Sequence, residues 1–119
     1  MPLYHVTTSN GLRGMRKDGF IDPLRSKGKR EYSWFVPLFK VDWAILNTQV
    51  RHAVPLSEVI VIQIDLDGYH FSEHAGSCKF FRKDRTPVTY FGRVFTAGEW
   101  IARNADEAAF QDWGPESIK

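Results

Sequence analysis

Three side chains that could bind a metal ion recur at regular intervals in the middle of the chain. His70, His74 and Cys78 are four residues apart, so a helix would place all three on one face. Imidazole nitrogen and thiolate are ligands that Zn²⁺ prefers, but a structural zinc site takes four ligands and no fourth is marked here. Gly68 and Gly76 interrupt the segment and favour a loop over a helix. We therefore predict an exposed loop without a metal site.

A second segment, residues 79–93, interleaves cationic with aromatic side chains. Such a pattern suits nucleic acid, because unpaired bases stack on aromatic rings and phosphates pair with cations. The same pattern arises in an antiparallel hairpin with one buried and one solvated face, and the turn-like residues 83–87 predict such a hairpin over residues 79–95. The residues concerned are Lys79, Phe80, Phe81, Arg82, Lys83, Arg85, Tyr90, Phe91 and Arg93, and the basic loop of Arg25, Lys27, Lys29 and Arg30 offers a second contact. Both interpretations stay open at this point.

The N-terminal part of the chain carries a longer combination of motifs. Residues 3–7 read Leu-Tyr-His-Val-Thr and are followed by Asn10, by Gly19-Phe20 and by Gly-Lys-Arg-Glu-Tyr at residues 28–32. This combination resembles the ADP-ribosyltransferase superfamily, in the branch with a His-Tyr-Glu triad that includes poly(ADP-ribose) polymerases and DNA-modifying bacterial toxins. Domains of that branch open with Leu-x-His-Gly-Thr/Ser, then have an Asn, a short helix ending in Gly-Leu or Gly-Phe, and later Gly-Lys-x-x-Tyr. The likeness covers roughly the first third to half of the chain.

The resemblance implies both a function and a binding site. It implies transfer of ADP-ribose from NAD to a macromolecular acceptor, either a protein or a nucleic acid. His5 would hydrogen-bond a ribose hydroxyl of NAD, the backbone of Val6 would hold the nicotinamide amide, and Tyr32 would stack on the nicotinamide ring. Thr7 and Asn10 belong to the same implied NAD-binding set.

Glu99 is the candidate for the third catalytic residue beside His5 and Tyr32. Followed by Trp100, it is similar to the family's Glu-aromatic-aliphatic strand start. The carboxylate would then stabilise the positive charge that develops as nicotinamide leaves. Thr96 and Glu99 also match a helix capping box, in which the same carboxylate caps a helix and has no catalytic role. The pattern leaves both interpretations open.

The remaining elements follow from hydrophobic spacing and from turn residues. The predicted strands cover residues 3–6, 32–36 and 58–66, and the predicted helices cover residues 9–18 and 39–49. Residues 58–66 begin with apolar side chains on both faces, which is typical of a central strand. Gly19 is expected to end the first helix in the left-handed conformation.

Length and composition limit the classes of protein that this chain can be. Its 119 residues suit one domain, 1–119, and its 43% hydrophobic and 25% charged residues exclude wholesale disorder. A net charge of +2 is too small to predict nucleic-acid or membrane binding from overall charge. The single Cys78 favours a reducing compartment, and the apolar runs are too short to cross a bilayer. We therefore expect a soluble, cytoplasmic protein with no membrane partner.

Together these patterns predict a small α+β domain similar to that of ADP-ribosyltransferases. We expect a mixed, split β-sheet of about five or six strands, two or three helices, and a cleft between the halves of the sheet. The alternative function is a non-enzymatic binding or inhibitor protein on the same scaffold. It would contact a protein or nucleic-acid partner through the basic, aromatic hairpin.

Overall fold

A strand that leads directly into a capped helix begins the described structure, a computed structural model that covers residues 2–25 and 32–103. Strand β1 (Leu3–Thr8) ends at Thr8, whose side-chain oxygen accepts the amide of Gly11 at 3.0 Å and so caps helix α1 (Ser9–Asp18). The helix ends at Gly19, whose φ of 89° is a left-handed conformation that glycine adopts without strain. The predicted first helix and its glycine cap are confirmed.

The main sheet has three strands with β4 (Val59–Ile64) in the centre. Strand β1 pairs with one edge of β4, and β8 (Phe91–Thr96) pairs with the other; both pairs are antiparallel. Because β4 is covered on both faces, its side chains from alternate positions enter two different parts of the core. The predicted central strand is confirmed.

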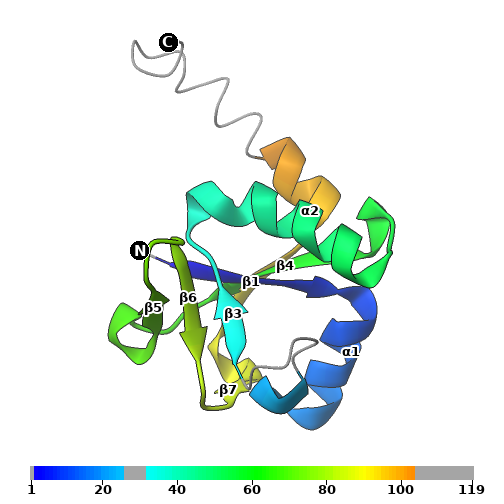
Figure 1. Ribbon diagram of the computed structural model, residues 1–119. Helices are drawn as coiled ribbons and strands as arrows, with labels where there is room; N and C mark the ends of the chain where they lie inside the picture. Colours follow the sequence, from blue (N-terminus) through cyan, green and yellow to red (C-terminus); the bar gives the residue numbers. More distant parts are fainter. Residues whose placement is uncertain (1, 26–31, 104–119) are drawn as a thin grey trace.

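Each face of the main sheet carries its own hydrophobic cluster. Helix α2 (Val41–His52) and the helical residues 97–103 contribute to the first cluster, and α1 contributes to the second. The first cluster contains Tyr4, Val36, Val41, Ala44, Ile45, Val59, Val61, Phe95, Ala97 and Trp100. The second contains Leu3, Leu12, Ile21, Phe35, Ile60, Ile62, Ile64 and Phe71. Figure 1 shows α1 and α2 on opposite sides of β1.

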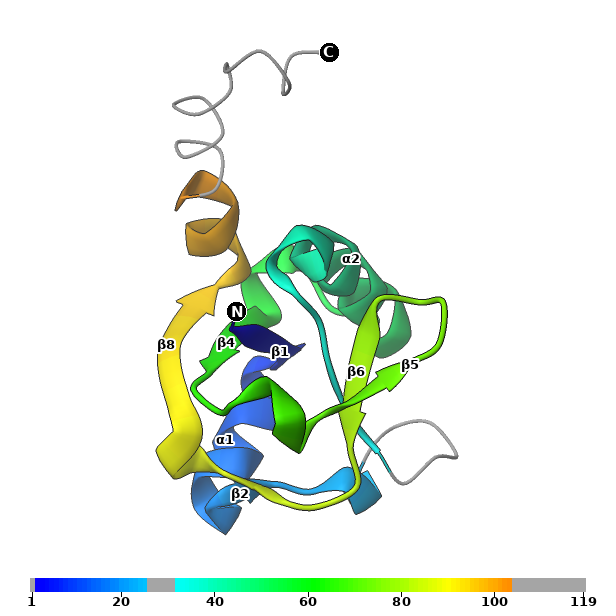
Figure 2. The same cartoon turned by 90° about the vertical axis from the view of Figure 1, so that its left-hand side faces the viewer.

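The other strands form two smaller antiparallel sheets. In one, β6 (Lys79–Arg82) lies between β3 (Ser33–Phe35) and β5 (Ser72–His74). In the other, β2 (Phe20–Ile21) pairs with β7 (Thr86–Pro87). Figure 2 shows β6 and β8 on opposite sides of the molecule. Short 3₁₀ turns lie at Pro23–Arg25, Leu38–Lys40, Leu56–Glu58, Gly68–His70 and Val88–Tyr90.

The predicted hairpin over residues 79–95 is wrong. Strand β6 pairs with β3 and β5, whereas β8 pairs with β4, so the two halves of the expected hairpin belong to different sheets. An alternating pattern shows that a strand has two unlike faces, but it does not say which neighbour receives the backbone hydrogen bonds. The turn residues between the halves therefore redirect the chain from one sheet to the other.

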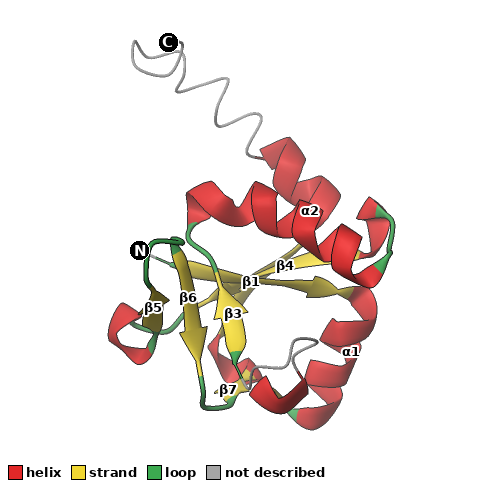
Figure 3. Ribbon diagram, in the orientation of Figure 1, coloured by secondary structure: helices red, strands yellow, loops and turns green. Residues whose placement is uncertain are grey.

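The prediction of a small α+β fold is confirmed. Among the described residues, three α-helices accompany the three sheets, and every strand pair is antiparallel (Figure 3). No helix in this part of the chain is long and apolar enough to cross a membrane.

The stability of the domain should depend most on the central strand. Ile62 is fully buried in β4, and shortening it by one methyl group in Ile62→Val is expected to lower the free energy of unfolding by about 0.5–1.5 kcal/mol. Val50 is 74% exposed on α2, so Val50→Ala should change it by no more than about 0.5 kcal/mol. Urea denaturation measures both, and equal effects would contradict the assignment of β4 to the core.

Candidate functional site

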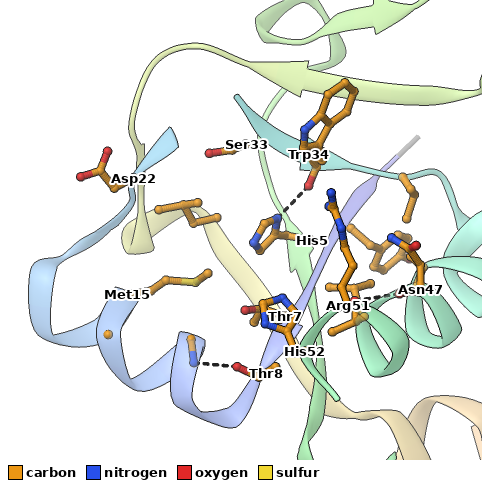
Figure 4. Close-up of a pocket in the computed structure, with 18 of the residues that line it drawn as sticks. His5, Thr7, Thr8, Met15, Asp22, Ser33, Trp34, Asn47, Arg51 and His52 are labelled. Atoms are coloured by element: carbon orange, nitrogen blue, oxygen red, sulfur yellow. Dashed lines mark hydrogen bonds between the residues drawn. The ribbon is translucent and has the colours of Figure 1, made fainter. Parts of the chain in front are cut away.

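Strands β1 and β3 touch at one point and then separate. At that point Tyr4 and Val36 exchange two backbone hydrogen bonds, of 2.8 Å from the Tyr4 amide and 2.9 Å from the Val36 amide. Beyond it a cleft of about 1210 Å³ opens, with lining residues from β1, β3, α1 and α2. Figure 4 shows this cleft with α1 on one side and α2 on the other. The cleft therefore occupies the gap between the main sheet and the sheet of β3.

His5 lies in the middle of the cleft and links the two diverging strands. Its Nδ1 lies 2.7 Å from the backbone carbonyl of Trp34, and a carbonyl can only accept, so Nδ1 carries the proton. Burial lowers the pKa of His5 below its usual 6.5, although the hydrogen bond to Trp34 opposes the shift. At neutral pH the ring is therefore uncharged, and its Nε2 is a hydrogen-bond acceptor.

The backbone of Val6 lies at the open edge of β1. Because Tyr4 directs its amide and carbonyl toward β3, alternation along the strand directs those of Val6 toward the same edge. Among the described residues, the pairing between β1 and β3 is limited to Tyr4 and Val36. One donor and one acceptor of the main chain thus lie beside His5, where a ligand can take the place of a neighbouring strand.

Two residues of the β3 segment bring further groups to the cleft. The ring of Tyr32 stacks on Phe81, with ring centroids 4.5 Å apart and 28° between the planes. Ser33 is only 4% exposed, and its hydroxyl has no hydrogen-bond partner among the residues that the structure describes. Both residues line the cleft. Since a buried hydroxyl without a partner is costly, the Ser33 oxygen marks a place where a polar ligand atom would be stabilising.

The charges of the cleft favour an anionic ligand. Among the described lining residues, cationic side chains outnumber carboxylates. The cations are Arg13, Lys17, Arg51 and Lys79, and the carboxylates are Asp18 and Asp22. Figure 4 shows Arg51 beside His5. A cleft lined mainly by one sign of charge attracts ligands of the opposite sign.

The structure brings together most of the site residues that the sequence suggested. His5, Val6, Thr7, Asn10 and Tyr32 all line the same cleft, although residues 28–31 of the second motif lie outside the described residues. Sequence reasoning missed Ser33 and Arg51. Arg51 lies beyond the predicted end of the second helix at residue 49, and the only signal for Ser33 was its position next to Tyr32.

Glu99 does not belong to this cleft. The Thr96 amide donates to its carboxylate at 2.8 Å, and the Glu99 amide donates to the Thr96 hydroxyl at 3.1 Å. These reciprocal bonds are a capping box, and residues 97–103 are helical, so the strand expected to start at Glu99 is wrong. Trp100 is buried, at 3% exposure, and lies in this helix. Glu99 is exposed and lies beyond the end of β8, with β4 between that strand and β1.

The structure also shows what the possible metal ligands of residues 70–78 and the cationic and aromatic residues of 79–93 do. Residues 72–74 form β5 and His74 contacts the Ser77 hydroxyl at 3.0 Å, while no group of three or more potential ligands that could hold a metal occurs among the described residues. Arg82 donates to the Thr86 hydroxyl and to the carbonyls of His70 and Arg85, so its guanidinium holds a turn together. Phe80 and Phe91 pack against the core. Most of residues 25–30, the predicted basic loop, lie outside the described part of the chain.

Comparison with known proteins identifies the fold only. No family model matches the sequence, and no curated protein matches it. The structure is similar to that of protein CC0527 from Caulobacter crescentus, with a TM-score of 0.58 and 9% sequence identity over 80% of this chain and 84% of that one. A double mutant of CC0527 gives the same values. At this identity the similarity concerns the arrangement of the elements and not the chemistry of the cleft.

The capping role of Glu99 predicts a characteristic dependence of stability on pH. The Thr96 amide, followed by the Thr96 hydroxyl, holds the pKa of Glu99 below its usual 4.5, so the charged carboxylate stabilises the fold above that pH. This contribution is lost as the pH falls from 4.5 through the lower pKa of the folded state. The melting temperature of Glu99→Gln should therefore lie below that of the wild type at pH 7, and the difference should shrink in acid. A difference in melting temperature that is the same at pH 7 and in acid would contradict this assignment.

Proposed function

We propose that the cleft binds NAD and that the protein transfers the ADP-ribose unit of NAD to a macromolecular acceptor. The proposal combines the N-terminal resemblance with the groups that line the cleft. Its volume of about 1210 Å³ exceeds the roughly 300–1,000 Å³ of ordinary small-molecule sites, so a dinucleotide has room.

The groups around the split between β1 and β3 fit the nicotinamide half of NAD. The Nε2 of His5 can accept a hydrogen bond from a ribose hydroxyl, because Nδ1 carries the proton. The amide and carbonyl of Val6 match the acceptor and the donor of a carboxamide. Tyr32 offers the flat surface on which a nicotinamide ring can stack. Cations such as Arg51 suit the diphosphate.

The observation that carries the proposal most directly is the buried Ser33 hydroxyl, which has no hydrogen-bond partner among residues 2–25 and 32–103. Buried polar groups almost always have a partner, and those that lack one call for an explanation. In this cleft, a polar atom of the bound dinucleotide would supply the missing hydrogen bond. The proposal thus explains a feature that packing alone would disfavour.

The proposed transfer exchanges one bond at ribose C1′ for another. The bond from C1′ to the nicotinamide nitrogen breaks, and nicotinamide leaves with the electron pair. A nucleophile of the acceptor then bonds to C1′ and gives up its proton to water. Positive charge develops on the ribose in between, and the described carboxylates that line the cleft are Asp18 and Asp22.

A second candidate function is binding without transfer. The position of Glu99 favours it, because the carboxylate that the resemblance assigned to catalysis caps a helix instead. In this alternative the cleft still binds NAD but does not cleave it, and the protein functions by binding a partner. The two candidates agree on NAD binding and differ only in the release of nicotinamide.

The Ser33→Ala variant tests whether the Ser33 hydroxyl binds a ligand or stabilises the fold. Removing a buried hydroxyl without a partner should leave the free energy of unfolding unchanged or raise it by about 1 kcal/mol. The same change should weaken NAD binding, measured by calorimetry, by about tenfold, because a bound ligand would lose a hydrogen bond in a buried site. A less stable protein with unchanged NAD affinity would contradict the proposal.

Tyr32→Ala tests the stacking surface, with Tyr69→Ala as the matched control. Loss of the Tyr32 ring should weaken binding of NAD and of free nicotinamide by about tenfold. Tyr69 is 81% exposed and lies outside the cleft, so its replacement should change neither affinity. Release of nicotinamide from NAD with labelling of an acceptor supports transfer, binding without release supports the second candidate, and no NAD binding at millimolar concentration ends both.

A further inference from the structure

We propose that the outer face of α2 binds a second copy of this chain, in an antiparallel contact about a two-fold axis. The surface is defined here as the α2 stripe, which consists of Phe39, Trp43, Leu46 and Val50. Phe39 belongs to the 3₁₀ turn Leu38–Lys40, which leads directly into α2. The inference does not rest on the proposed function, because self-association can be measured without NAD.

The α2 stripe exposes large apolar side chains that lie close together. Phe39 is 73% exposed and Val50 is 74% exposed, while Leu46 is 61% exposed. Half of the exposed large hydrophobic residues in the described part of the chain lie within residues 38–50. Figure 2 shows α2 at the edge of the molecule. Scattered apolar side chains are normal at a protein surface, whereas a group of them indicates an interaction surface.

The spacing of the α2 stripe gives this helix two apolar faces. The four residues of the stripe are separated by four, three and four positions, so they form one row along the outer face. The opposite face holds α2 on β1 and β4 and carries the buried residues Val41, Ala44, Ile45 and Thr48. A row with alternating steps of four and three residues is the seam through which two helices pack side by side. The outer face therefore fits another helix.

The α2 stripe is symmetric about its midpoint, which lies between residues 44 and 45. A copy turned by a two-fold rotation runs antiparallel, so Phe39 meets Val50 of the second copy and Trp43 meets Leu46 of the second copy. Each layer then pairs an aromatic ring with a smaller aliphatic side chain, which fills the space between the helices evenly. A parallel copy would place ring against ring in two layers and small against small in the others. The antiparallel arrangement is therefore the better fit.

The polar residues beside the α2 stripe agree with the two-fold arrangement. Lys40 and Asn47 flank the stripe on one side, and Asp42 and Gln49 flank it on the other. In the antiparallel contact Lys40 lies beside Asn47 of the second copy, and Asp42 lies beside Gln49 of the second copy. No like charges meet, and each charge faces an amide that can hydrogen-bond to it.

The ring of Trp43 is held in place by two lysines of the same chain. The ammonium groups of Lys40 and Lys79 lie 4.7 Å and 5.4 Å from its centroid. Such cation–π contacts restrain the ring. A side chain that is already ordered loses less conformational freedom when a partner binds, so Trp43 is suited to a position in the contact.

The area of the α2 stripe sets the strength of the contact. Because a whole aromatic side chain buries roughly 150–250 Å², the four partly exposed side chains supply on the order of 400 Å² per copy. A standard interface buries about 800 Å² per partner, and smaller interfaces belong to weak, transient complexes. We therefore expect a reversible dimer with a Kd of about 10–100 μM.

Sedimentation equilibrium of the full chain, from about 10 μM to about 1 mM, tests the inference. The wild type should pass from monomer to dimer and form nothing larger, because a two-fold contact closes on itself. Leu46→Gln should weaken the dimer by about tenfold or more, since the change occurs twice in each dimer. Leu46 is exposed in the monomer and glutamine is a good helix former, so the variant should still fold. Leu24→Gln is the matched control: Leu24 is 67% exposed outside the α2 stripe, and its replacement should leave the association unchanged.

Disulfide formation tests the direction of the two copies. The exposed Cys78 is first replaced by serine, so that only the introduced cysteine can react. A mixture of the Phe39→Cys and Val50→Cys proteins should then form a linked dimer, because these positions meet in the two-fold contact. Neither protein alone should form one, since its two cysteines would be at least about 15 Å apart along the helices, too far for a disulfide.

Three results would overturn the inference. The first is a wild-type protein that stays monomeric up to about 1 mM, which would leave the α2 stripe to a different partner. The second is a dimer that Leu46→Gln does not weaken, because the contact would then lie elsewhere on the molecule. The third is a linked dimer formed by the Phe39→Cys protein alone, because that requires a parallel arrangement.

Discussion

The position of the cleft depends on one main-chain contact that joins two sheets in the described part of the chain. The paired hydrogen bonds of Tyr4 and Val36 fix where β1 and β3 meet, and the strands diverge on one side of that contact. At the next residue of β1, the Nδ1 of His5 donates a hydrogen bond to the Trp34 carbonyl and so also links the two strands. The positions of the His5 ring and of the cleft therefore depend on the register of this contact. A shift of the register by one residue would turn His5 away from Trp34.

The two hydrophobic clusters hold that geometry in place. Helix α2 packs against β1 and β4 on one face, and α1 packs against β1 on the other, so both walls of the cleft are anchored on the strand that carries His5. Burial then keeps the imidazole neutral, which preserves Nε2 as an acceptor. Ser33 is buried as well, so its hydroxyl is kept away from bulk water.

Local patterns in the sequence predicted local structure well and pairing between distant strands poorly. Spacing and turn residues predicted the first strand over residues 3–6, the helix ended by Gly19 and the central strand over residues 58–66. The structure has these strands at Leu3–Thr8 and Val59–Ile64. The pairing of β6 with β3 does not, because it depends on which edge is free after the sheets have formed. Of the two interpretations of Glu99, the structure confirms the capping box, which is a local signal, and not the strand start, which rested on the resemblance.

The open edge at Val6 affects how far the amino-acid sequence records such a site. Every residue except proline carries the same amide and carbonyl, so a ligand held by the main chain places almost no constraint on the side chain at that position. A valine can stand there provided that its side chain fits the core, against which Val6 packs. A ligand held by this edge would be bound through atoms that a comparison of side chains does not record. At 9% sequence identity, the similarity to CC0527 concerns only the path of the backbone.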